Sequence, residues 1–247
     1  MDSGDRDVVV LTGATGFLGR ELLWKLMKEL PASADIVCIV RQGPSGRADK
    51  AAPGPASPAS AQDAAASRLE ELLAAGCPLP AGDPRRQRVR ALCGDITEPR
   101  LGLSAEQFHA LAASCTYIFH GAATVRFDLP LAEAERINVG GTRAIVELAE
   151  AAHQARRLRR FCYIGTAYVA GRRIGRVTED ELLCGQEFNN TYEQTKCAAE
   201  ALIREHMARP APLPTTLLRP SIIVGDSKSG YTSSFKVMYW PLKIFAR

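Results

Sequence analysis

The chain has 247 residues, of which 46% are hydrophobic and 23% charged, with a formal net charge of +4. This composition provides enough apolar side chains for a large core and excludes an intrinsically disordered polymer. The charge is modest and no motif interleaves basic with aromatic residues, so we expect no nucleic-acid partner.

The N-terminal segment lacks the features of a secretion signal. Residues 1–7 are acidic where such a signal is basic, and the apolar run 8–11 is short. No run approaches the roughly 18 apolar residues of a membrane span, so we expect a cytoplasmic protein without a transmembrane segment. The seven cysteines form no CxxC pair. We interpret them as reduced core thiols and expect no metal site.

Short apolar runs alternate with segments of helical periodicity along most of the chain. The pattern predicts strands at 7–12, 35–40, 88–93, 115–120, 159–164 and 215–218. It predicts helices at 17–30, 63–75, 104–113, 130–154 and 191–208. Strands and helices in alternation indicate an α/β fold with a doubly wound parallel sheet of the Rossmann type.

Two segments interrupt this alternation. Residues 42–62 are rich in Ala, Pro, Ser and Gly, which favours a flexible surface insertion. Residues 227–247 become aromatic and apolar. We therefore expect a dinucleotide-binding domain at 1–226, followed at 227–247 by the start of a substrate-binding region that is largely missing.

A glycine-rich turn joins the first strand to the first helix, with the sequence Thr-Gly-Ala-Thr-Gly-Phe-Leu-Gly at 12–19. Glycines let the backbone approach a pyrophosphate, and the N-terminus of the helix supplies N–H groups and positive potential. The residues expected to contact the cofactor here are Gly13, Thr15, Gly16, Phe17, Leu18 and Gly19.

The residue after the second strand indicates which nicotinamide cofactor binds. An acidic residue there accepts the ribose hydroxyls of NAD, whereas a cation binds the 2′-phosphate of NADP. Arg41 stands at this position with no acidic neighbour, which favours NADPH.

Residues after the third and fourth strands are further candidates. Asp95 could accept the adenine amino group and Ile96 could pack on the ring, although Asp95 is also suited to capping a turn. After the fourth strand the chain could pass close beneath the cofactor at three small residues, Gly121, Ala122 and Ala123. We interpret His120 as a positioned core residue and not as a catalyst.

The predicted catalytic group is Thr166, Tyr192 and Lys196. Tyr192 and Lys196 form a YxxxK pattern, which places both side chains on one face of a helix. Lys196 could lower the pKa of the phenol and hold the nicotinamide ribose, while Thr166 at the end of the fifth strand could bind a substrate carbonyl. Strand alternation would put Tyr168 on the same side as Thr166, as a pocket or core residue.

An amide within a predicted helix marks one further candidate. Asn138 precedes the pair Gly140-Gly141 in the helix predicted at 130–154, where both residue types cost stability. We expect close packing against the active-site strands and include Asn138 among the cofactor-binding candidates.

Together the turn at 12–19, Gly94-Asp95-Ile96, the Tyr192/Lys196 pair and Arg-Pro-Ser-Ile-Ile-Val-Gly-Asp-Ser at 219–227 resemble the thioester reductase branch of the extended short-chain dehydrogenases. That branch includes the reductase domains of nonribosomal peptide synthetases and carboxylic acid reductases, and the fatty acyl-CoA reductases. The resemblance implies that Pro220 and Ile222 border the nicotinamide. It also implies that Arg68 is a second 2′-phosphate contact, a role that Arg47 or Lys50 could fill instead.

The resemblance implies NADPH-dependent reduction of an acyl thioester, on coenzyme A or a phosphopantetheine carrier, to an aldehyde or, after a second reduction, to an alcohol. Two alternatives stay open. One is an NAD(P)-dependent sugar-nucleotide or steroid-type dehydrogenase or epimerase with the same triad, and the other is a non-catalytic NADP-binding module.

Overall fold

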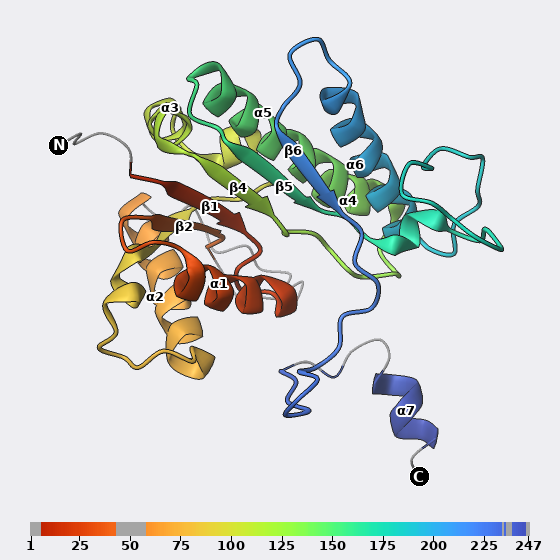
Figure 1. Cartoon of the computed structure of the whole chain (residues 1–247), viewed down its shortest axis with the longest axis horizontal. Coiled ribbons are helices and arrows are strands. Elements are labelled where there is room, and N and C mark those ends of the chain that lie inside the picture. The colour runs from red at the N-terminus through yellow and green to blue at the C-terminus, as the bar shows by residue number, and fades with distance from the viewer. Residues whose placement is uncertain (1–5, 43–57, 234, 236–238, 246–247) are drawn as a thin grey trace.

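Six parallel strands form one sheet in the order β3-β2-β1-β4-β5-β6, with helices on both faces (Figure 1). This computed structural model describes residues 6–42, 58–233, 235 and 239–245. The strands are β1 (Val8–Thr12), β2 (Asp35–Val40), β3 (Val89–Cys93), β4 (Tyr117–His120), β5 (Arg160–Ile164) and β6 (Thr215–Leu218). The predicted doubly wound parallel sheet is confirmed, and strand ends differ from the predicted ones by at most two residues.

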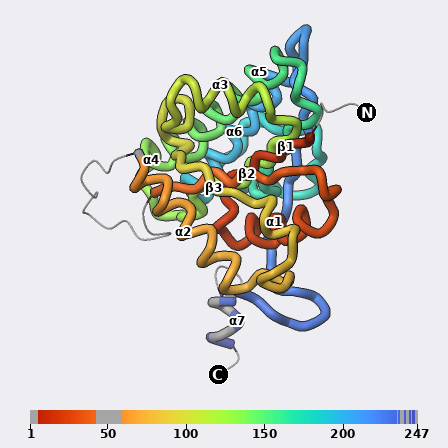
Figure 2. Tube along the Cα trace, turned by 90° about the vertical axis from the view of Figure 1, so that its left-hand side faces the viewer, coloured from red at the N-terminus to blue at the C-terminus, as the bar shows by residue number. Residues whose placement is uncertain are grey.

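Both faces of the sheet are covered because the central strands are apolar at consecutive positions. In β1, Val9 and Leu11 pack towards α1 (Phe17–Glu29) and α2 (Pro58–Gly76). The alternate residues Val8 and Val10 pack towards α3 (Ala105–Ser114) and α5 (Gly141–Gln154). A further helix, α6 (Thr191–Met207), lies on the α5 side of the sheet (Figure 2). All residues of β1 are buried, as a strand between two helical layers requires.

The predicted insertion at 42–62 ends earlier than expected. Helix α2 begins at Pro58, so residues 58–62 are helical, while 43–57, with Arg47 and Lys50, lie outside the described residues. Gln62, in the part of the helix that was not predicted, contacts the sheet. Its amide donates to Ala91 O and accepts from Cys93 N, both at 2.9 Å, so it pairs with the outer edge of β3. Composition alone did not reveal this contact.

The helix predicted at 130–154 is not one regular helix. It consists of α4 (Leu131–Glu135), a π-helical turn η3 (Arg136–Gly140) and α5. Asn138 lies in the π turn, and Gly141 at the start of α5 lets Ile96 approach closely. A π turn in a helix is frequent at functional sites, which fits the position of Asn138 described below.

The fifth strand ends at Ile164, as its predicted range has it, but Thr166 was expected to close that strand and does not. Strand β5 stops at Ile164, and Thr166 instead caps the short 3-10 helix η4 (Ala167–Ala170) by accepting a hydrogen bond from Tyr168 N at 3.2 Å. The alternation argument for Tyr168 was therefore wrong, because that residue is not in a strand. Two other short 3-10 helices, η1 (Pro84–Arg88) and η2 (Pro99–Gly102), were not predicted.

After β6 the chain leaves the sheet and runs to α7 (Tyr239–Phe245), away from the helical layers (Figure 1). The Tyr239 hydroxyl accepts a hydrogen bond from Gly225 N at 2.8 Å. Within the described ranges, no helix is both long and apolar enough to span a bilayer. The domain boundary predicted at 226 remains a prediction.

The adjacent glycines Gly140 and Gly141 allow a matched test of the packing. A Cβ on Gly141 would lie 2.5 Å from Ile96 Cδ1, whereas one on Gly140 meets only Glu135 O at 3.8 Å. We expect Gly141→Ala to destabilise the fold by about 1–3 kcal/mol through overpacking. Gly140→Ala should stabilise it by about 0.5–1 kcal/mol through helix propensity. Urea denaturation of both variants measures this, and equal effects would contradict the packing.

Candidate active site

The candidate site lies at the carboxyl edge of the sheet, where the strand order reverses between β1 and β4. Thr12 at the end of β1 is level with His120 in β4, which is level with Tyr163 in β5. The segments that follow these strands are thus brought together. In open parallel sheets this edge is where ligands bind.

The glycine turn is too tightly packed for any side chain at its first and last glycines. Gly13 has φ +79°, and a Cβ there would lie 2.8 Å from Ala122 N. A Cβ on Gly19 would lie 1.9 Å from Gly13 O. Gly16 precedes α1 and provides no side-chain cap, so the N-terminus of that helix can bind a pyrophosphate. Of the other predicted contacts, Thr15 is exposed, and Phe17 and Leu18 are half-buried.

The two predicted phosphate-binding cations lie side by side. Arg68 in α2 donates a hydrogen bond from its guanidinium to the backbone oxygen of Arg41 at 2.5 Å. Burial and the charge of Arg41 both lower the pKa of Arg68. Two neighbouring cations at the end of β2 create positive potential where a dianionic 2′-phosphate would be stabilised.

Asp95 and Ile96 interact with the protein itself in this structure. One Asp95 carboxylate oxygen accepts hydrogen bonds from Thr97 N and Thr97 Oγ1, both at 2.9 Å, so the residue does cap a turn. Ile96 is buried against Gly141. Their contacts with an adenine ring remain predictions.

Asn138 joins the segment after β4 to α6. Its side-chain oxygen accepts from Thr124 N at 2.9 Å, and its amide nitrogen donates to Thr195 Oγ1 at 2.9 Å. The residue is buried. It therefore holds α6 beside the half-buried segment that the sequence analysis placed beneath the cofactor, Gly121, Ala122 and Ala123.

The three predicted catalytic residues do come together. The side chain of Thr166 lies close enough to Tyr192 to lower the pKa of its phenol, and Lys196 lies one turn further along α6. Burial raises the pKa of the Tyr192 phenol, and the neighbouring Thr166 hydroxyl only partly opposes this. The expected lowering of that pKa by Lys196 is thus not observed in this structure.

Lys196 is a buried cation with one hydrogen-bond partner among the contacts described. Its Nζ donates to Ile164 O at 2.8 Å and lies 4.5 Å from the centre of the Tyr163 ring. Burial lowers the pKa of the ammonium to about 7, against the opposing effect of Glu200. A lysine in this state can change protonation near neutral pH.

The sequence analysis missed the ion cluster that supports α6. Glu200 is fully buried and accepts hydrogen bonds from Arg219 at 2.6 Å and from Arg204 at 2.9 Å. Arg219 precedes Pro220, whose backbone oxygen accepts from Ala167 N at 2.9 Å. The cluster therefore connects the catalytic helix to the segment after β6. A glutamate one turn after Lys196 is the signal that could have indicated it.

Two aromatic side chains lie next to Tyr192. The ring of Phe127 is 5.6 Å from that of Tyr192 and is 43% exposed, so it extends the site with an apolar surface. Tyr168 in η4 is close enough to raise the pKa of Tyr192. Ile222, predicted to border the nicotinamide, is 36% exposed.

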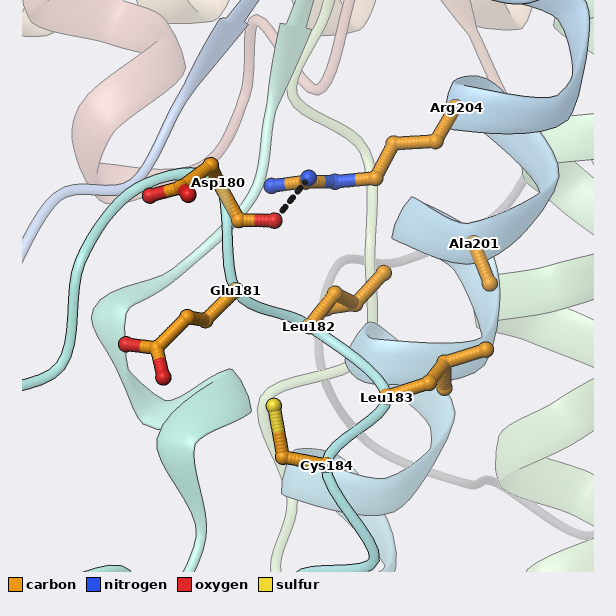
Figure 3. A pocket seen from close by; sticks show the side chains of 7 residues that line it. All are labelled: Asp180, Glu181, Leu182, Leu183, Cys184, Ala201 and Arg204. Carbon is orange, nitrogen blue, oxygen red and sulfur yellow. Dashed lines mark hydrogen bonds between the residues drawn. The ribbon is translucent and has the colours of Figure 1, made fainter.

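A hollow of about 390 Å³ lies on another side of α6 (Figure 3). Its lining includes none of the predicted catalytic residues and consists of Asp180, Glu181, Leu182, Leu183, Cys184, Ala201 and Arg204. Arg204 crosses one end to donate to Asp180 O at 2.8 Å. Among the described residues, no three His, Cys, Asp or Glu side chains are grouped to hold a metal ion.

Comparison with known proteins identifies relatives along almost the whole chain. A family model described as Male sterility protein, an NAD-binding domain, matches residues 11–247. Isonitrile lipopeptide synthase of Streptomyces coeruleorubidus is 33% identical over 234 residues, covering 94% of this chain and 14% of that protein. Fatty acyl-CoA reductase 1 of Rattus norvegicus is 31% identical over 251 residues, covering 90% of this chain and 44% of that protein.

Solved structures also resemble this chain. The terminal R domain of the myxalamid PKS-NRPS pathway has a TM-score of 0.78 and 30% identity, covering 98% of this chain and 55% of that one. UDP-glucuronic acid 4-epimerase from Bacillus cereus, in complex with NAD, has a TM-score of 0.58 at 22% identity, which shows a shared fold alone. The chain spans about half the length of the R domain and of the fatty acyl-CoA reductase.

The buried ammonium of Lys196 predicts a specific dependence of stability on pH. With a folded-state pKa of about 7, the folded chain loses a proton that the unfolded chain retains up to its higher pKa. The free energy of unfolding should therefore rise between about pH 7 and pH 8.5, by at most about 1.4 kcal/mol per pH unit from this group. Urea denaturation should show this contribution lost in Lys196→Met and retained in Lys25→Met, a change of an exposed lysine. Equal slopes in the parent and Lys196→Met would contradict it.

Proposed function

This chain belongs to the family of NAD-binding domains described as Male sterility protein, and we propose that it is the cofactor-binding part of an NADPH-dependent reductase of acyl thioesters. The observation that carries this proposal is the meeting of Thr166, Tyr192 and Lys196 beside a glycine turn. Family relatives named as fatty acyl-CoA reductases and synthetase reductase domains support the substrate class. The thioester carrier would be coenzyme A or phosphopantetheine.

The residues at the sheet edge fit NADPH. Gly13 and Gly19 keep the turn at 12–19 packed tightly against the protein backbone, and the N-terminus of α1 that follows the turn would bind the pyrophosphate. Arg41 and Arg68 would bind the 2′-phosphate. Lys196, buried beside Ile164 O, would hold the nicotinamide ribose.

The catalytic residues would then act on the carbonyl oxygen. When bound, the reduced nicotinamide supplies a hydride for the carbonyl carbon. Thr166 donates a hydrogen bond to the oxygen and Tyr192 gives it a proton, so that no free oxyanion builds up. The hemithioacetal formed in this way loses its thiol as the C–S bond breaks and the hydroxyl proton leaves, yielding the aldehyde. A second reduction of the aldehyde would give an alcohol.

The catalytic role of the phenol is tested with Tyr192→Phe. We expect the rate of palmitoyl-CoA-dependent NADPH oxidation, followed by absorbance, to fall by about 10²–10⁴-fold because general acid catalysis is lost. The Kd for NADPH should change less than about threefold, since the ring remains in place. Tyr231→Phe is the matched control, because that exposed phenol lies after β6 and outside the proposed triad. An unchanged rate in Tyr192→Phe, or tight NADPH binding by the parent without any turnover, would count against the proposal.

The cofactor preference is tested with Arg41→Ala and Arg68→Ala. Each should weaken NADPH binding about tenfold or more, because one charge-assisted phosphate contact is lost, and should leave NADH binding nearly unchanged. Fluorescence titration measures both affinities. Arg6→Ala is a suitable control, since Arg6 pairs with Asp35 at the opposite end of β2. A parent protein that binds both cofactors equally would refute the preference for NADPH.

A further inference from the structure

His120 is a buried titratable group for which the proposed reaction has no use. It is 2% exposed at the end of β4, directly between the glycine turn and α5. Each ring nitrogen has a threonine hydroxyl as its partner. Nδ1 lies 2.7 Å from Thr12 Oγ1, and Nε2 lies 3.3 Å from Thr142 Oγ1.

The contacts of Thr142 fix the proton on Nε2. Thr142 Oγ1 lies 2.6 Å from the backbone oxygen of Asn138, and a carbonyl oxygen can only accept. The Thr142 hydroxyl proton is therefore used in that bond. The oxygen of Thr142 is then left to accept from His120, which requires a proton on Nε2.

The contacts of Thr12 leave Nδ1 without a proton. Ala122 N donates to Thr12 Oγ1 at 3.2 Å, so the hydroxyl of Thr12 is free to donate to Nδ1 of His120. A proton on Nδ1 would deprive the Thr12 hydroxyl of its acceptor among the contacts described. Lys196 from α6 and the Tyr163 ring from β5 also lie beside His120. Burial and the Lys196 charge lower the pKa of His120 to about 3.

A second series of hydrogen bonds starts at the same residue, Asn138, whose backbone oxygen accepts from Thr142, and it leads into the catalytic helix. Asn138 donates from its side chain to Thr195 Oγ1, and Thr195 donates to Thr191 O at 2.7 Å. Thr195 stands between Tyr192 and Lys196 in α6. These hydrogen bonds thus connect the backbone after β4 to β1, His120 and the π turn, and from the π turn to α6.

We propose that His120, neutral and protonated on Nε2, is a positioning residue that fixes the glycine turn relative to the helix carrying Tyr192 and Lys196. Neutral imidazole has one donor and one acceptor, which is what these two threonines require. Proton transfer is sensitive to misplacement of about 1 Å, so a change in this spacing would affect the rate more than binding. The catalytic consequence rests on the proposed function, whereas the protonation state does not.

Nitrogen-15 NMR tests the protonation state directly. The chain has four histidines, and the His120→Gln variant identifies the His120 signals. We expect one protonated nitrogen, Nε2, and one unprotonated nitrogen, Nδ1, from neutral pH down to about pH 5, where an ordinary histidine with a pKa of about 6.5 is charged. A proton on Nδ1, or ordinary titration of His120, would overturn the inference. If the His120→Gln variant does not fold, Thr142→Val serves for assignment, because it should shift the Nε2 signal alone.

Matched threonine variants test the positioning role. Thr142→Val removes the hydroxyl that bonds to His120 and to Asn138. Thr116→Val removes a buried hydroxyl that bonds to Val8 N and Val8 O at the opposite end of β4. We expect Thr142→Val to lower kcat for palmitoyl-CoA at least tenfold with the Kd for NADPH unchanged within threefold, which corresponds to about 1.4 kcal/mol or more in the transition state. Thr142→Ser should restore most of the rate. Similar losses in Thr142→Val and Thr116→Val would overturn the positioning role.

Amide hydrogen exchange gives a readout that needs no turnover. In Thr142→Val, the amides of residues 121–124 and of the first half of α6 should lose protection from exchange at least tenfold. In Thr116→Val, neither segment should lose protection. Unchanged exchange in Thr142→Val would overturn the inference. A parent protein that is inactive but shows the expected exchange and NMR signals would contradict the proposed function and leave the positioning of the two segments supported.

Discussion

The structure depends on the close approach of the chain segments that follow β1 and β4. At Gly13 the two backbones are so near that a Cβ would lie within 2.8 Å of Ala122 N. Gly13 also has φ +79°, a left-handed conformation that glycine adopts without strain. The close approach also places the N-terminus of α1 against the switch point of the sheet. The cofactor edge is therefore a consequence of backbone packing before any side-chain chemistry is added.

Charge burial is the second constraint, and it is concentrated in α6. Lys196 and Glu200 are both buried one turn apart, but they are neutralised in different ways. Glu200 accepts hydrogen bonds from two arginines, which compensate for its loss of contact with water. Lys196 has a backbone carbonyl and an aromatic ring, which solvate an ammonium less well than water does. The supporting glutamate is thus paired with two cations, whereas the ammonium of Lys196 in the site can change protonation near neutral pH.

The sequence was informative where a local pattern has one physical interpretation. Apolar runs predicted all six strands, and YxxxK predicted a phenol and an amine on one helix face. It failed where a distant partner decides the outcome. Helix α2 begins at Pro58, before the predicted start, and Gln62 in this added part bonds to β3. The unpredicted π turn holds Asn138, which bonds to Thr124 and Thr195. Neither contact has a signature in the residues on either side.

Thr166 also lies in a different local structure from the expected one. Thr166 was expected to end a strand, but its hydroxyl can accept a hydrogen bond from the N–H two residues further on, and this favours a cap. The residue still reaches Tyr192, because the cap begins immediately beyond the sheet edge. The predicted triad therefore formed with different local geometry from that expected.

The pairing of Gln62 with β3 has a consequence for the whole sheet. A terminal strand with free N–H and carbonyl groups can recruit a strand from another molecule, and proteins commonly block such edges. Here one amide side chain occupies a donor and an acceptor of β3, as a seventh strand would. Since Arg68 lies on the same helix as Gln62, the contact that covers this part of the edge also ties the helix carrying Arg68 to the sheet.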